Sequence, residues 1–251
     1  MIWDQMTSDQ IEQLDKNIPV VLVMAATEQH GPHLPLATDR IIGEYFAHTL
    51  NDELSEQVII LPTISVGCSS HHMAFPGTLS LSHNSFYRQV KDIIESVIHH
   101  GFCKIIFLNS HGGNVGISRV LMEQLGYQFP DTHFIMATWW RIAASELKGI
   151  SETETGGTGH ACEFETSLMM LIASHLVLET KIQSKCNIPS FPWAESDMLQ
   201  GPEAEYYRPI KKMTPSGVYG EPMAASAEKG KQISKCVIAA LIRIIKDLKN
   251  I

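Results

Sequence analysis

Short apolar runs alternate with helical patterns along the chain, and this alternation predicts an α/β protein. The run Val20-Val21-Leu22-Val23-Met24 is continuously apolar, which suits a strand buried on both faces. Three further apolar runs predict strands at 58–61, 104–108 and 133–137. Apolar residues at helical spacing predict helices at 7–16, 39–50, 85–100, 162–174 and 224–249. We therefore expect a single domain over residues 1–251, with a mostly parallel sheet flanked by helices.

The segments between these elements are expected to be loops. Residues 62–84 show neither the helical spacing nor the apolar run of a strand. Residues 149–159 are rich in Gly, Thr and Ser, which is typical of a mobile loop. Residues 186–222 are rich in proline and should be mostly irregular. Thr7 and Gln10 have the spacing of a capping box, which predicts a helix start there.

Composition and charge exclude several classes of protein. Hydrophobic residues make up 44% and charged residues 18% of the 251 residues, which excludes a disordered or fibrous chain. The net charge of −8 excludes a nucleic-acid binder that relies on a basic field. No apolar run approaches the roughly 18 residues of a membrane span, and the first ten residues carry no basic segment typical of a secretory signal. Five widely spaced cysteines without a C-x-x-C pair indicate free thiols, and hence the cytoplasm.

The densest polar cluster follows the first expected strand. Glu28 and His30 are two residues apart, so on an extended segment both side chains point to the same side. Asp39 stands at the start of the next expected helix and can reach the same space at the carboxyl end of the sheet. Carboxylates and an imidazole that converge there suit a first-row metal ion. The alternative is a surface loop in which Asp39 only caps a helix.

Two more polar clusters follow later in the chain. Asn109 to Asn114 form the run Asn-Ser-His-Gly-Gly-Asn directly after the strand expected at 104–108, so His111 should meet the first cluster. Residues 159–167 open an apolar helix with two acids and a histidine. A glycine-rich turn can carry an incidental histidine, and first-turn acids can simply complement the helix dipole. Both clusters also suit the walls of a site.

These motifs together resemble the creatininase (creatinine amidohydrolase) family. The resemblance rests on the segment Glu28 to Leu36 with Asp39, on 109–114 and 159–167, on Phe75-Pro76-Gly77-Thr78, and on 225–230. It extends from about Pro19 to the terminal helix. It implies a creatininase-like α/β fold and an amidohydrolase with two divalent metal ions per chain, zinc paired with zinc, manganese or iron. It also implies a homo-oligomer, often a hexamer.

The resemblance further implies roles for single residues in the first two clusters. Glu28 looks like a ligand of one metal and His30 like a ligand of the other. Asp39 looks like a bridge between the metals, and His111 completes the first site. A water between two such metals loses a proton near neutral pH and can attack an amide carbonyl.

The third cluster supplies the remaining expected residues. In creatininase a glutamate two residues after the metal-binding histidine completes the second site, and this chain has Gly113 there. Family members with this His-Gly-Gly-Asn form have a glutamate at the position of Glu163, which is therefore expected as the replacement ligand. His160 matches the catalytic histidine and is expected to protonate the leaving nitrogen. Glu165 is expected to orient a ligand or His160.

One aromatic side chain and one imidazole are expected to contact the substrate. Trp140 follows the fourth expected strand and His72 lies in the long loop before Phe75, so both are candidates for the pocket wall. A core tryptophan and a solvated loop histidine are the alternatives. Residues 154–159 hold no aromatic, whereas creatinine-hydrolysing relatives have a tryptophan there. We therefore expect creatinine to be a poor substrate.

The expected function is hydrolysis of a C–N bond in a small cyclic amide, a formamide or a short peptide. Neither nucleic acid nor a membrane is expected as a partner. Two alternatives stay open on the sequence. Cys162 lies near His160 and could form a thiol hydrolase. The chain could also be a metal-dependent binding protein with little turnover.

Overall fold

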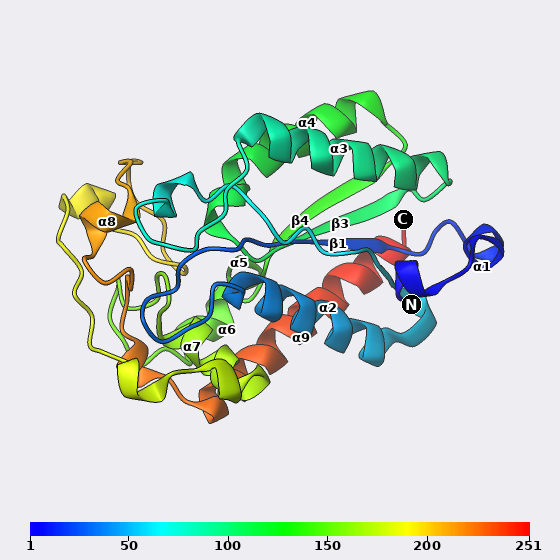
Figure 1. The fold of residues 1–251 in the computed structure, drawn as a ribbon. Helices are drawn as coiled ribbons and strands as arrows, with labels where there is room; N and C mark the ends of the chain where they lie inside the picture. The colour runs from blue at the N-terminus through cyan, green and yellow to red at the C-terminus, as the bar shows by residue number, and fades with distance from the viewer.

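A four-stranded parallel sheet forms the centre of the computed structural model, which describes residues 1–251 (Figure 1). The strand order is β2-β1-β3-β4, with bounds Ile59–Ile60, Val20–Met24, Lys104–Asn109 and His133–Thr138. The register of β1 on β3 runs from Val20 opposite Ile105 to Met24 opposite Asn109. All five residues of β1 are buried, as its continuous apolar run predicts. The predicted α/β fold is confirmed.

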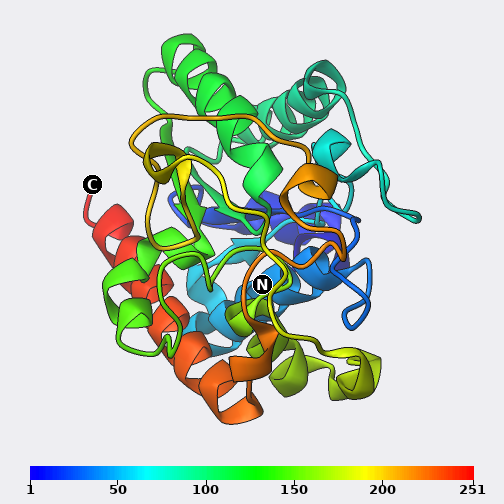
Figure 2. The same ribbon diagram turned by 90° about the vertical axis from the view of Figure 1, so that its left-hand side faces the viewer.

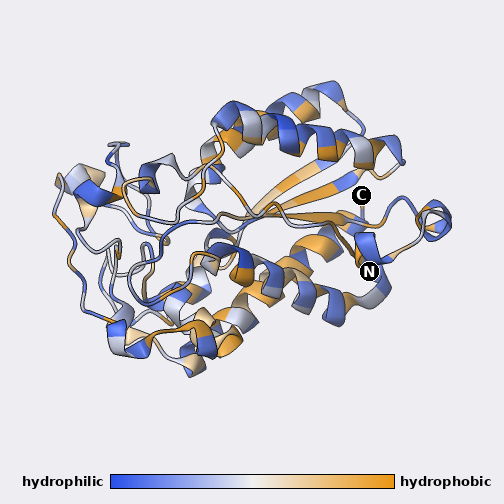
Figure 3. Cartoon of the chain, viewed as in Figure 1, coloured by the Kyte–Doolittle hydropathy of each residue, from blue (hydrophilic) through white to orange (hydrophobic).

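Helices cover both faces of this sheet (Figures 1 and 2). One face carries α2 (Thr38–Leu54), α7 (Glu163–Ile172) and α9 (Ala227–Lys249), with the short α5 (Trp139–Ile142) and α6 (Ala144–Lys148) beside them. The opposite face carries α3 (His83–His99) and α4 (Val115–Gln128). The helices turn their apolar sides to the strands and their polar sides outward (Figure 3).

The hydrophobic core is divided by the sheet into two parts. Val21 and Val23 pack among residues of α2, α7 and α9. Val20, Leu22 and Met24 pack among residues of α3 and α4 instead. Neighbouring residues of one strand therefore contribute to opposite parts, because successive side chains point to opposite faces of a sheet.

The predicted strands and helices are all present, with bounds that differ by a few residues in either direction. The first helix is α1 (Ser8–Gln13), and the predicted capping box of Thr7 and Gln10 is confirmed. The proline-rich segment 186–222 is mostly irregular, as expected, and contains only short helical turns such as α8 (Ile210–Met213). The helix α4 is not predicted by the sequence pattern. This helix buries only Ser118, Leu121 and Leu125, so its apolar face is too narrow to give a clear period.

The connections create a crevice at the carboxyl ends of the strands. β1 continues through its loop into α2 on one face, whereas β3 continues into α4 on the other face. The strand order thus reverses between β1 and β3, which is where open parallel sheets hold their ligands. Figure 2 faces this end, and the yellow and orange segment 186–222 crosses in front of it. No helix is both long and apolar enough to cross a membrane.

Candidate metal centre and active site

Two carboxylates and two histidines meet at this crevice. Glu28 and His30 come from the loop after β1, Asp39 from the first turn of α2, and His111 from the end of β3. All four side chains are buried, with at most 3% exposed. The loop is held in place by Glu28, whose backbone N–H donates to Leu36 at 3.0 Å, and it turns at Gly31 with a φ of 65° that favours glycine. The predicted convergence of these four residues is present.

Asp39 lies between the two histidines. Its Oδ1 is 3.2 Å from His30 Nε2, and its Oδ2 is 3.1 Å from His111 Nδ1. His111 Nδ1 is also 3.3 Å from Glu28 Oε1. The two oxygens of Asp39 therefore face two different imidazoles, which is the arrangement expected of a bridging carboxylate.

Each of these imidazoles is oriented by a backbone carbonyl. His30 Nδ1 donates to the Glu28 carbonyl oxygen at 3.1 Å, and His111 Nε2 donates to the Cys68 carbonyl oxygen at 3.1 Å. A carbonyl oxygen only accepts, so one proton of each ring is on that nitrogen, and the other ring nitrogen faces the carboxylates. A metal ion would replace the second proton of each ring and take the lone pair of that nitrogen. This is the pattern of metal-binding histidines, whose second N–H is held by a carbonyl or carboxylate.

Several buried atoms of the cluster have no hydrogen-bond partner. These are Glu28 Oε2, His30 Nε2 and Asp39 Oδ2. A buried polar atom without a partner costs about 1–3 kcal/mol, and more if it is charged. Lone pairs from two carboxylates and two imidazoles that face one another fit divalent cations. The ligand atoms of Glu28, His30 and Asp39 lie within 4.8 Å of one another.

The charges inside the cluster shift its pKa values. Burial by itself lowers the pKa of His30, but the charge of Asp39 outweighs it and raises the pKa well above the ordinary value. Burial also lowers the pKa of His111, but the negative charge of Glu28 and the contacts with Asp39 outweigh it and raise the pKa well above the ordinary value. The cluster thus strongly favours positive charge at the point where the imidazoles meet the carboxylates.

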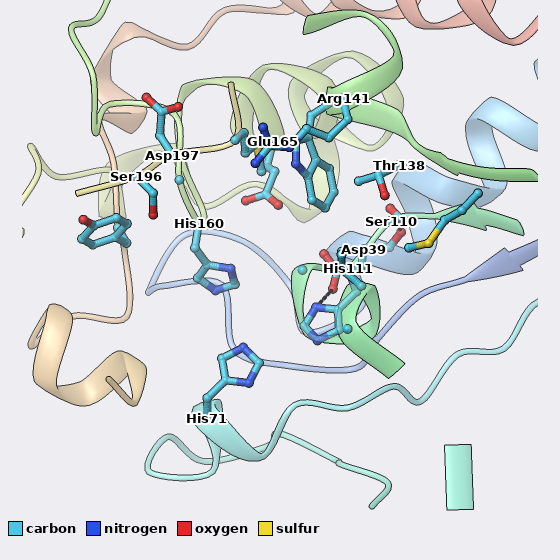
Figure 4. Close-up of a pocket in the computed structure, with 18 of the residues that line it drawn as sticks. Asp39, His71, Ser110, His111, Thr138, Arg141, His160, Glu165, Ser196 and Asp197 are labelled. Carbon is cyan, nitrogen blue, oxygen red and sulfur yellow. Dashed lines mark hydrogen bonds and ion pairs between the residues drawn. The ribbon is translucent and has the colours of Figure 1, made fainter. Parts of the chain in front are cut away.

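His160 forms the wall of the cluster opposite His111 (Figure 4). Its backbone is pinned to Tyr219 by two hydrogen bonds of 2.6 and 2.8 Å, and its Nε2 donates to the Gln29 carbonyl oxygen at 2.7 Å. Its Nδ1 therefore carries the lone pair and faces Glu28 Oε1 at 3.6 Å. Burial, followed by the charge of His30, lowers the pKa of His160 to about 3, so its imidazole is neutral at pH 7. A neutral imidazole can accept a proton and pass it on.

The two acids of α7 have different surroundings. Glu165 Oε1 lies 3.8 Å from His30 Nε2, and Glu165 Oε2 accepts from the Ala161 backbone N–H at 2.5 Å. The ligand atoms of Glu165, His30 and His160 lie within 4.8 Å of one another. From the sequence, Glu165 was expected only to orient a ligand or His160, whereas in the structure its carboxylate lies inside the cluster.

Glu163, which was expected to complete the second metal site, does not lie in the cluster. Its carboxylate is fully buried and contacts Lys229 Nζ at 2.5 Å. It also accepts from the Ser151 and Thr153 hydroxyls at 3.1 and 2.9 Å. The physical reason is helix geometry. Residues two apart on an α-helix point about 200° apart, so Glu163 and Glu165 cannot face the same site.

A cavity of about 1320 Å³ opens from this cluster, and the cluster forms part of its wall. The predicted substrate residues Trp140 and His72 both line it, as does Tyr219. Trp140 also packs edge-on against Trp139, with ring centroids 5.3 Å apart. His72 is buried, and its Nε2 lies 3.3 Å from Glu28 Oε1, so it holds Glu28 as well as facing the cavity.

Cys162 offers no support for a thiol hydrolase. Its side chain is fully buried in the hydrophobic core below the sheet, and it does not line the cavity. Burial raises the pKa of its thiol, so the reactive thiolate is disfavoured.

The sequence indicates no role of their own for Gln29 and Lys229, and it leaves open whether His71 contacts the substrate, the surroundings of a metal or only solvent. Gln29 joins three segments, because its side chain contacts His72 Nδ1 at 2.8 Å and the Gly217 carbonyl at 3.2 Å. His71 lines the cavity, and Lys229 partners Glu163. The position of Gln29 between two expected ligands in Glu-Gln-His was the one signal for it. Lys229 lies in the motif 225–230, but nothing in that motif indicates that it pairs with Glu163.

Known proteins with similar sequences cover most of this chain. The family profile described as "Creatininase: Creatinine amidohydrolase" matches residues 4–245. A mycofactocin precursor peptide peptidase of Mycobacterium ulcerans is 29% identical over 88% of this chain and 82% of its own. The 3-dehydro-scyllo-inosose hydrolase of Thermotoga maritima is 26% identical over 98% of this chain and 83% of its own. The creatinine amidohydrolase of Pseudomonas putida is 23% identical over 91% of this chain and 88% of its own.

Solved structures share the fold. A creatinine amidohydrolase-like protein from Bacteroides fragilis superposes with a TM-score of 0.84 at 25% identity, over 99% of this chain and 96% of its own. Creatininases in a manganese form and a zinc–zinc form each superpose with a TM-score of 0.79 at 20% identity, over 98% of this chain and 97% of theirs. The profile match over nearly the whole chain is decisive: the chain belongs to the creatininase family of hydrolases.

Proposed function

We propose that this protein hydrolyses the C–N bond of a peptide-like amide with the help of two divalent metal ions. One observation carries the proposal. His30 Nε2 and His111 Nδ1 meet the carboxylates at one buried place, while the opposite N–H of each imidazole is held by a backbone carbonyl. Such a set is costly without a cation and well suited to one.

We assign the ligands of the two metals from the distances. Glu28, Asp39 and His111 would hold the first ion, and His30, Asp39 and Glu165 would hold the second, with Asp39 as the bridge. This assignment replaces Glu163 by Glu165 in the second site. When bound, the metals would activate a water molecule and polarise the scissile carbonyl.

His160 would move the proton in this reaction. Its Nδ1 faces Glu28 across 3.6 Å and lies at the cavity, while the Gln29 carbonyl fixes the ring by its Nε2 proton. Nδ1 is therefore placed to take a proton during attack and to deliver it to the leaving nitrogen. An amine leaving group needs this proton, and general acid catalysis of this kind contributes about 10²–10⁴-fold to the rate.

The substrate is proposed to be larger than a flat five-membered ring. The cavity of about 1320 Å³ exceeds what a small lactam fills, and residues 154–159 offer no aromatic cover. The most identical of the relatives named above is a peptidase, which supports a short peptide or a peptide-like amide.

The decisive experiment combines metal analysis with a substrate screen. Protein loaded separately with zinc, manganese and iron(II) is assayed on lactams, formamides and short peptides, with the metal content of each sample measured. We expect two ions per chain and hydrolysis of a peptide-like amide. Two bound ions without turnover of any of these amides would contradict the proposed function and favour a binding role.

The expected homo-oligomer stays a prediction. Light scattering of the metal-loaded protein measures the mass directly, with 27.9 kDa as the value for a single chain.

A further inference from the structure

We propose that His71 is a protein ligand of the first metal, alongside Glu28, Asp39 and His111. The inference deepens the proposed function, because it assumes that a metal binds at this site. It adds a second imidazole to a site that otherwise holds one imidazole and two carboxylates.

His71 is the unengaged imidazole at the edge of the cluster. It belongs to the short helix η3 (Ser70–His72), is half-buried, and lines the cavity. Its side chain makes no hydrogen bond or ion pair within the protein. Its ligand atom lies within 4.8 Å of ligand atoms of both Glu28 and His111. In Figure 4 its ring stands below His160 and beside His111, facing the space between them.

The neighbouring histidine shows the contrast. Both ring nitrogens of His72 are engaged, with Nδ1 2.8 Å from Gln29 Nε2 and Nε2 3.3 Å from Glu28 Oε1. If the Gln29 amide donates to Nδ1, then His72 Nε2–H donates to Glu28. His72 is therefore a positioning residue for Glu28, whereas the lone pair of His71 is free for a cation.

Gly113 explains why the loop after β3 cannot supply this ligand. A Cβ at position 113 would lie 2.1 Å from the Cys68 carbonyl oxygen, 2.5 Å from His111 Nε2 and 2.8 Å from His71 Cε1. Backbone and imidazole thus fill the space beside His111, and only glycine fits. The His71 ring lies nearly parallel to that of His111, with centroids 5.8 Å apart and planes at 15°. The donor on this side of the site therefore comes from η3.

A second imidazole changes which metals the site prefers. Carboxylate and water ligands suit manganese, whereas imidazole suits zinc, iron and copper. Two imidazoles and two carboxylates also leave room for one water or substrate atom on a five-coordinate zinc. We therefore expect the first site to favour zinc, iron(II) or cobalt(II) over manganese because of His71.

Cobalt(II) binding tests the inference without an activity assay. Metal-free protein is titrated with cobalt(II), and both the stoichiometry and the visible absorption spectrum are recorded. Loss of a partner that only orients a ligand costs about 10–100-fold in metal affinity, so loss of a direct ligand should cost about 100-fold or more. We expect the wild type to bind two cobalt(II) ions. His71→Ala should bind one ion with the affinity of the wild type and the other about 100-fold or more weakly, and its visible absorption spectrum should differ from that of the wild type.

Two further variants make the result unambiguous. Met73→Ala, at an exposed neighbouring position, should bind both ions like the wild type. His71→Glu supplies another ligand and should recover the second ion, which a merely structural role would not produce. Circular dichroism of the metal-free variants checks the fold.

The outcomes separate the two proposals. Two ions with wild-type affinity and spectrum in His71→Ala would overturn the role of His71 and leave the metal centre intact. No cobalt binding by the wild type would instead overturn the proposed function itself.

Discussion

Lys229 Nζ lies 2.5 Å from Glu163 Oε1, and this ion pair is buried between the first turns of α7 and α9. Lys229 also donates to the Ala224 carbonyl oxygen at 2.6 Å. Glu163 in turn holds residues 151–153 through two hydroxyls and the Glu152 backbone N–H. The pair therefore fixes the start of the segment that leads to His160.

The two glutamates of α7 should respond differently to the same substitution. Glu165→Gln removes a carboxylate that lies 3.8 Å from His30 Nε2, so we expect one metal ion per chain to be lost. Glu163→Gln is the matched control and should keep both ions, because its carboxylate contacts Lys229 instead. Elemental analysis after gel filtration measures both. If Glu163→Gln lost an ion while Glu165→Gln kept two, Glu163 would be the metal ligand.

Removing Lys229 should destabilise the protein strongly. Lys229→Met leaves a fully buried carboxylate without its counter-ion, which costs about 3–5 kcal/mol. The double variant Glu163→Gln/Lys229→Met should recover a large part of this, since it buries no unpaired charge. Chemical unfolding of the metal-free proteins gives these free energies. If the losses of Glu163→Gln and Lys229→Met simply add up to the loss of the double variant, the pair is not coupled.

His160→Ala should keep the fold and the metals but lose activity. The ring is not needed to complete either ligand set, and its loss removes the proton donor, so we expect about a hundredfold or greater drop in kcat. The loss should be smaller for an amide or ester whose leaving group departs without a proton. Steady-state kinetics of the wild type and of His160→Ala are measured on one substrate with a poor and one with a good leaving group. Equal losses on both substrates would indicate that His160 only positions the substrate.

Creatinine should be a poor substrate. Trp140 and Tyr219 line the cavity, but residues 154–159 hold no aromatic to cover a flat ring. Without this cover, water exclusion and ring stacking are both weakened. Turnover is measured with each metal and compared with a short peptide. Creatinine hydrolysis in the ordinary range, with a KM of about 1 mM or less, is the result that contradicts this.

A chelator should abolish activity, and a thiol reagent should not. Cys162 is fully buried and its thiol pKa is raised by burial, so it does not react as a thiolate. Cys186 is exposed and is the expected place of alkylation. Mass spectrometry locates the modified cysteine while activity is followed. Inactivation that tracks alkylation of Cys162, with the metals retained, would restore the thiol mechanism.

The sheet and four residues of the buried cluster could be predicted from the sequence. The apolar run of β1 indicates burial on both faces, and the polar groups that follow β1 and β3 must share one edge, because parallel strands end there together. Glu28, His30, Asp39 and His111 could therefore be predicted to meet. The helix α4 could not be found in this way, since its buried face contains a serine and only two leucines.

Tertiary packing, not local sequence, separates Glu163 from Glu165. Both stand in the first turn of one helix, and the motif contains both, so the local sequence does not tell which acid faces the cluster. The choice depends on how α7 is rotated against the sheet, and Glu163 is paired on the far side with Lys229 of α9, 66 residues away in the chain. The same holds for His71 and His72. They are neighbours in sequence, but only packing against Gly113 and Gln29 leaves one imidazole free and engages the other.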